Sequence, residues 1–86
     1  YTFVKYLVGV EGDRVKRVDD KVYINDELVC KIPSGNNLTP IDDLVIPKGY
    51  VFVKGTHEDS LDSRYKEFGL VKVTSLKGKA VGWMER

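Results

Sequence analysis

The chain has 86 residues, 42% of them hydrophobic and 31% charged, which is enough for one small folded domain and is atypical of disordered proteins. Its formal charge of +1 comes from Lys and Arg interspersed with Asp and Glu, so no basic stripe predicts a nucleic-acid partner. The single cysteine, Cys30, excludes an intramolecular disulfide and any cysteine-rich metal site, and we expect no metal or cofactor.

Apolar side chains recur with a period of two, which predicts short strands separated by turns. In chain order the predicted strands are Thr2–Val8, Arg14–Val18, Lys21–Ile24, Leu28–Ile32, a short apolar stretch at Ile41–Ile46, Tyr50–Lys54, Val71–Val73 and Lys79–Met84. Asn25-Asp26 is typical of a two-residue hairpin turn, because both residue types tolerate positive φ. The polar segment Gly55–Ser63 leaves room for one helical turn. We therefore predict a single all-β domain over residues 1–86, a coiled antiparallel sheet or partial barrel.

Two segments carry a resemblance to a known family. Residues 5–13, KYLVGVEGD, resemble the type I signal peptidase segment K-R-x-x-G-x-P-G-D, and residues 55–65, GTHEDSLDSRY, resemble the same family's G-D-N-x-x-x-S-x-D-S-R-Y. Between and after them, Val22–Asn25, Ile46–Val53, Gly78–Ala80 and Trp83-Met84 fit the family in the same order. The resemblance implies the C-terminal portion of the catalytic domain of a signal peptidase I-type protease, with the signal peptidase β-fold.

The chain departs from the family pattern in several places. Tyr6 and Thr56 stand where the family usually has Arg and Asp, so both partners of a possible ion pair are absent together, which avoids a lone buried charge. Glu11 replaces the usual Pro, and Lys66–Phe68 precede Gly69 where the family usually has one residue. Gly-Thr-His in place of Gly-Asp-Asn is more similar to the conjugative-transfer branch that matures pilins.

By this resemblance, Lys5 is the general base of a Ser–Lys dyad. A serine hydroxyl becomes a good nucleophile when a base takes its proton, and an uncharged amine shielded by apolar neighbours can do so. Without the resemblance, a lysine in a strand is usually a solvent-facing one. The nucleophilic serine belongs to an S-M-x-P-type motif, which does not occur in these residues, so we expect it upstream of Tyr1.

The second motif supplies the supporting residues. The resemblance implies that Ser60 orients the lysine amine, whereas on chemistry alone a serine here can simply cap its own turn. It also implies that Asp62 and Arg64 form an ion pair that braces the catalytic loop with Ser63, the alternative being two exposed charges. Gly55 is expected to allow close backbone approach. His57, the only histidine, has no second ligand nearby in the sequence and is read as a loop residue without chemistry.

The substrate implied is an extended signal or leader peptide of a preprotein or prepilin. It would pair with the edge formed by Thr2, Phe3, Val4 and Lys5, with Val4 lining a pocket for small residues, although Val4 could equally be ordinary core. No apolar run reaches the ~18 residues of a membrane span, so any membrane anchor lies before Tyr1. The setting implied is the bacterial inner (cytoplasmic) membrane, with the catalytic domain on the periplasmic side.

Two other classes stay open. A non-catalytic relative could keep this domain as an assembly or chaperone module for pilins or secreted proteins, and an unrelated small β-barrel could match by chance. Retention of Lys5, Ser60, Asp62 and Arg64 together argues against chance, while the upstream serine decides between enzyme and module. We expect these 86 residues alone to be inactive.

Overall fold

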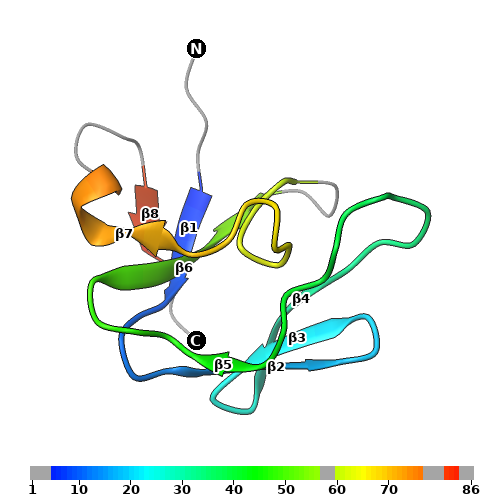
Figure 1. Cartoon of the computed structure of the whole chain (residues 1–86), viewed down its shortest axis with the longest axis horizontal. Coiled ribbons are helices and arrows are strands. Elements are labelled where there is room, and N and C mark those ends of the chain that lie inside the picture. The colour runs from blue at the N-terminus through cyan, green and yellow to red at the C-terminus, as the bar shows by residue number, and fades with distance from the viewer. Residues whose placement is uncertain (1–4, 57–59, 77–80, 84–86) are drawn as a thin grey trace.

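The computed structural model describes residues 5–56, 60–76 and 81–83, and side chains as far as residue 74 (Figure 1). Within those ranges it contains eight strands and one short 3-10 helix, η1. The elements are β1 (Lys5–Gly9), β2 (Arg14–Val18), β3 (Lys21–Ile24), β4 (Glu27–Lys31), β5 (Leu44–Val45), β6 (Tyr50–Gly55), β7 (Val71–Lys72), η1 (Val73–Leu76) and β8 (Val81–Trp83). None of the helical structure in this part of the chain is long and apolar enough to cross a membrane.

The first sheet has the strand order β7-β6-β1-β8. Two residues of the candidate site lie in it, Lys5 in β1 and Gly55 in β6. Strand β1 pairs antiparallel with β6, with Lys5 opposite Gly55 and Leu7 opposite Val53. On its other side β1 pairs in parallel with β8. The register between β1 and β6 shifts between Leu7 and Gly9, where the ladder contains an irregularity.

The second sheet has the order β4-β3-β2-β5, in which β2, β3 and β4 form consecutive antiparallel hairpins and β5 pairs antiparallel with β2. At the β3–β4 turn, Asn25 and Asp26 both have positive φ, 50° and 71°, as a type I′ turn requires. Asn25 also ties this turn to the start of β2, since its side-chain oxygen accepts from the Arg14 amide at 2.9 Å. The hairpin predicted from the Asn-Asp pair is therefore confirmed.

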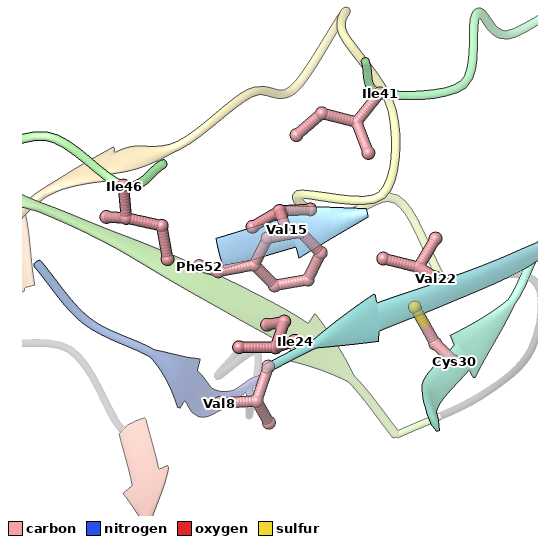
Figure 2. Close-up of a cluster of buried hydrophobic side chains, with 8 residues drawn as sticks. All are labelled: Val8, Val15, Val22, Ile24, Cys30, Ile41, Ile46 and Phe52. Atoms are coloured by element: carbon pink, nitrogen blue, oxygen red, sulfur yellow. The ribbon is translucent and has the colours of Figure 1, made fainter. Parts of the chain in front are cut away.

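The hydrophobic core lies between the two sheets, which both contribute side chains to it (Figure 2). Phe52 of β6 is fully buried among aliphatic side chains from the second sheet and the connecting segments. Gly9 lets the backbone of the first sheet approach this cluster, because an added Cβ would stand 2.8 Å from Ile46 Cδ1. The residues that make up the cluster are Val8, Val15, Val22, Ile24, Cys30, Ile41, Ile46 and Phe52.

The all-β fold class is confirmed, and the pairing is antiparallel except between β1 and β8. Some boundaries differ from those predicted. Within Ile41–Ile46 only Leu44 and Val45 form a strand, and Val73 begins η1 instead of extending β7. The described part of Gly55–Ser63 forms a bend and a turn without a helix. There the backbone groups are satisfied by β6 and by side chains, so no helical ladder is needed.

Candidate functional site

The side chain of Lys5 is held at the first residue of β1, beside the segment that follows β6. Its Nζ donates a hydrogen bond of 2.6 Å to the carbonyl oxygen of Leu61. The same nitrogen lies over the ring of Phe68, 5.1 Å from the ring centroid. Pairing of β1 with β6 thus places the amine of the partly exposed Lys5 against the Leu61 carbonyl, one residue beyond Ser60.

Gly55 ends β6 opposite Lys5, and the loop folds back closely over it. A Cβ at position 55 would collide with both Cβ and Oγ of Ser60. Gly55 is buried, and its amide donates a 2.8 Å hydrogen bond to Asp62 Oδ2. The close approach expected for this glycine is what brings the Ser60 segment against the end of β6.

Asp62 and Arg64 form a buried, two-pronged ion pair. Arg64 Nε donates to Asp62 Oδ1 and Arg64 Nη2 to Asp62 Oδ2, each at 2.7 Å. The side chains are 0% and 1% exposed, so these are not the two solvated charges of the simpler interpretation. Burial acts to lower the pKa of the Arg64 guanidinium, but the hydrogen bonds and charge of Asp62 outweigh it and the pKa is raised.

Arg64 also reaches across to the second sheet. Its Nη1 donates to the carbonyl oxygen of Lys31, the last residue of β4, at 2.7 Å. Ser63 fixes the same loop to β6, since its amide donates to the Val53 carbonyl and its Oγ accepts from the Val53 amide, both at 3.0 Å. The loop that contacts Lys5 is therefore attached to both sheets through buried polar groups.

The remaining sequence-predicted residues fall in two groups. Ser60 is partly buried and lies where the Lys5 amine meets the loop, and its role in orienting that amine stays a prediction. Thr2, Phe3, Val4 and His57 lie outside the residues that the structure describes, as do the ends of the closing segment.

A separate shallow groove of about 410 Å³ lies along β2 and β5 on the second sheet. Its lining includes Arg14, Lys16, Leu44 and Val45 but none of the predicted site residues. The groove is therefore separate from Lys5 and the Ser60–Arg64 loop. Within the described ranges, no group of three or more His, Cys, Asp or Glu side chains could hold a metal ion.

Sequence reasoning missed three partners in the site. Two are backbone carbonyls, of Leu61 and Lys31, and backbone groups leave no mark in a sequence because every residue carries one. The third is the Phe68 ring. Its position in an unusual stretch before Gly69 was visible in the sequence, but its contact with Lys5, 63 residues earlier, required the fold.

The sequence of this chain is similar to those of signal peptidases and related processing peptidases. A family model described as signal peptidase, peptidase S26, matches residues 1–84. Signal peptidase I U of Bacillus subtilis is 38% identical over 74 residues, covering 73% of this chain and 40% of that protein. Thylakoidal processing peptidase 1 of Arabidopsis thaliana is 33% identical over 84 residues, covering 92% of this chain and 23% of that protein. The chain thus spans less than half the length of either relative.

Among solved structures, a signal peptidase I from Enterococcus faecalis is similar with a TM-score of 0.51 and 31% sequence identity. The match covers 80% of this chain and 74% of that one.

Proposed function

Because the chain belongs to the signal peptidase family, peptidase S26, we propose that it is the lysine-bearing part of a serine endopeptidase that cleaves signal or leader peptides. Lys5 acts as the general base of a Ser–Lys dyad, and the nucleophilic serine comes from a segment upstream of Tyr1. The proposal treats residues 1–86 as one domain of that enzyme.

The observation that carries this proposal is the placement of Lys5 Nζ at the Ser60–Leu61 segment. The amine is fixed by the Leu61 carbonyl at 2.6 Å, and the buried Asp62–Arg64 pair holds the loop that presents this carbonyl. An amine held in one position can take a proton from a hydroxyl that enters beside it, which is the task of a general base. A solvent-facing lysine without a fixed partner would not be suited to it.

In this proposal the proton of the serine hydroxyl passes to Lys5 as the serine oxygen attacks the scissile carbonyl. Lysine then returns the proton to the leaving amine, and water hydrolyses the acyl-enzyme by the same route. Ser60 orients the amine, while Gly55, Ser63 and the Asp62–Arg64 pair keep the loop in place. The substrate peptide adds to the sheet edge formed by Thr2–Lys5, and Val4 selects small residues before the scissile bond.

The proposed setting follows from the same family relationship. The full-length protein is anchored in the bacterial inner membrane and acts on the periplasmic side, where it matures exported preproteins. Gly-Thr-His at residues 55–57 favours prepilins of conjugative transfer as a particular substrate class.

The test replaces Lys5 in the full-length gene product and follows cleavage of a preprotein with Ala or Gly before the scissile bond. Lys5→Ala and Lys5→Arg are both expected to abolish cleavage with the fold intact, since alanine has no amine and a guanidinium cannot accept a proton near neutral pH. Lys54→Ala is the matched control, because Lys54 lies in β6 opposite Tyr6 and has no part in the proposed chemistry. Normal cleavage by Lys5→Ala would rule out the dyad.

The location of the nucleophile has a separate test. The 86-residue chain alone is expected to give no turnover, and replacement of the upstream serine by alanine should inactivate the full-length protein. Turnover by the isolated chain that resists serine-directed inhibitors would show that the nucleophile is misplaced. An upstream segment without such a serine would instead favour an assembly module built on the protease fold.

A further inference from the structure

We infer that Phe68 is a positioning residue for the Lys5 amine. The segment before Gly69 then holds the general base in place in addition to forming a turn. The inference rests on the proposed role of Lys5 as general base. Phe68 belongs to the Lys66–Phe68 stretch, which is longer than the corresponding part of the family pattern, and the dyad chemistry alone assigns it no role.

The contact itself is a cation–π arrangement. Lys5 Nζ lies over the Phe68 ring at 5.1 Å from its centroid, within the ~6 Å at which such contacts are favourable. Leu61 provides the second contact through its carbonyl oxygen at 2.6 Å. The lysine side chain has four rotatable bonds and loses considerable rotamer freedom when fixed, so two contacts on the amine restrict it far more than one.

The ring is suited to this task because it stabilises the positive charge that the amine acquires as it takes the serine proton, without accepting a conventional hydrogen bond. The Leu61 carbonyl occupies one N–H group, whereas a ring face takes part through its quadrupole. The hydroxyl of the nucleophile can then approach the lone pair of the nitrogen. A polar side chain in the place of Phe68 would instead compete with that hydroxyl.

Phe68 is held in place by a tight turn. The Phe68 amide donates to the Tyr65 carbonyl at 3.2 Å, and the Gly69 amide donates to the same carbonyl at 2.8 Å. Gly69 has φ of 74°, which favours glycine and reverses the chain directly after the ring. Tyr65 is only 1% exposed and bridges to Pro40, so the start of the turn is anchored in the interior.

The two residues before Phe68 attach the turn to a second loop. Glu67 accepts hydrogen bonds from the amide and the hydroxyl of Thr39, each at 2.8 Å. Lys66 pairs with Asp42 at 2.7 Å and donates its amide to the Thr39 carbonyl at 2.8 Å. The polar members of the stretch thus fix it to residues 39–42 while its aromatic member contacts the lysine.

The experiment measures steady-state cleavage by full-length variants. Phe68→Leu keeps an apolar side chain but removes the ring, and it should lower kcat roughly 2- to 10-fold with KM within about twofold of wild type, since a cation–π contact carries about that factor. Phe68→Tyr keeps the ring and should retain kcat within about twofold. Val45→Ala, at an exposed apolar side chain on β5, is the matched control and should leave both parameters unchanged.

A second readout does not depend on activity or on the stability of Phe68→Leu. In the NMR spectrum, ring currents should shift the ε-methylene protons of Lys5 upfield in wild type and in Phe68→Tyr. Glu67→Gln keeps the ring but weakens the hydrogen bonds that attach the turn to Thr39. It should therefore reduce the upfield shift, and it should lower kcat less than Phe68→Leu does.

Several results would overturn the inference. A wild-type kcat in Phe68→Leu, an equal loss in Phe68→Tyr, an effect confined to KM, or an unshifted Lys5 resonance in wild type would each contradict it. If Lys5→Ala is inactive while Phe68→Leu is normal, the inference fails and the proposed function stands. If Lys5→Ala is active, the proposed function itself fails.

Discussion

Arg64 donates hydrogen bonds of 2.7 Å to both carboxylate oxygens of Asp62, and both side chains are at most 1% exposed. The two residues are separated in the sequence by Ser63 alone. Because Asp62 also accepts from the Gly55 amide and Arg64 donates to the Lys31 carbonyl, this pair connects the site loop to β6 and to β4. Breaking the pair therefore affects both sheets.

Arg64→Ala is expected to lower the free energy of unfolding by about 3–5 kcal/mol, because it leaves the buried Asp62 carboxylate without its counter-charge. Lys66→Ala is the matched control, since its ion pair with Asp42 is also 2.7 Å long but is solvent-exposed, and it should cost at most about 1 kcal/mol. Urea unfolding at pH 7 measures both. Equal losses for the two variants would show that the buried pair is not what stabilises the loop.

Gly55→Ala is expected to destabilise the protein by about 1–3 kcal/mol, because the new methyl group would overlap the side chain of Ser60. Ser60→Gly removes the obstructing atoms, so the double variant should recover most of that loss. A double-mutant cycle on unfolding free energies measures this coupling. Additive effects would mean that the Ser60 side chain is not what excludes a Cβ at position 55.

Burial raises the pKa of the Cys30 thiol to about 11, although the nearby Arg64 charge acts to lower it. The thiol should therefore react slowly with iodoacetamide at pH 8 in the folded protein and rapidly after unfolding in urea, as followed by mass spectrometry.

Because the Cys30 pKa is raised in the folded state, the free energy of unfolding should fall as pH rises through the alkaline range. The folded thiol has a higher pKa than the unfolded one, so its contribution is fully present below the ordinary value of 9.0 and is lost as pH rises toward about 11. Unfolding free energy should fall by at most about 2–3 kcal/mol over this interval. Cys30→Ala should fall by correspondingly less, and identical pH profiles for both proteins would contradict the assignment.

Local features of the fold could be predicted from the sequence because they depend on near neighbours in the chain. Alternation of apolar and polar residues predicted β2 and β3 with their observed bounds. The Asn25-Asp26 pair predicted the turn from β3 into β4, where both residues have positive φ. The close approach at Gly55 was also expected. By contrast, the 3-10 helix at Val73–Leu76 was missed, since β-branched Val73 was assigned to the preceding strand and no element was predicted for the three residues after it.

Only the tertiary structure decided which distant groups meet. The parallel pairing of β1 with β8, the carbonyls of Leu61 and Lys31, and the Phe68 ring all join segments far apart in the chain. The sequence singled out Lys5, Asp62 and Arg64 through their motif, but a motif names side chains and leaves their partners open. Those partners are mostly backbone groups, which every residue possesses, so chain folding alone selects the ones that serve the site.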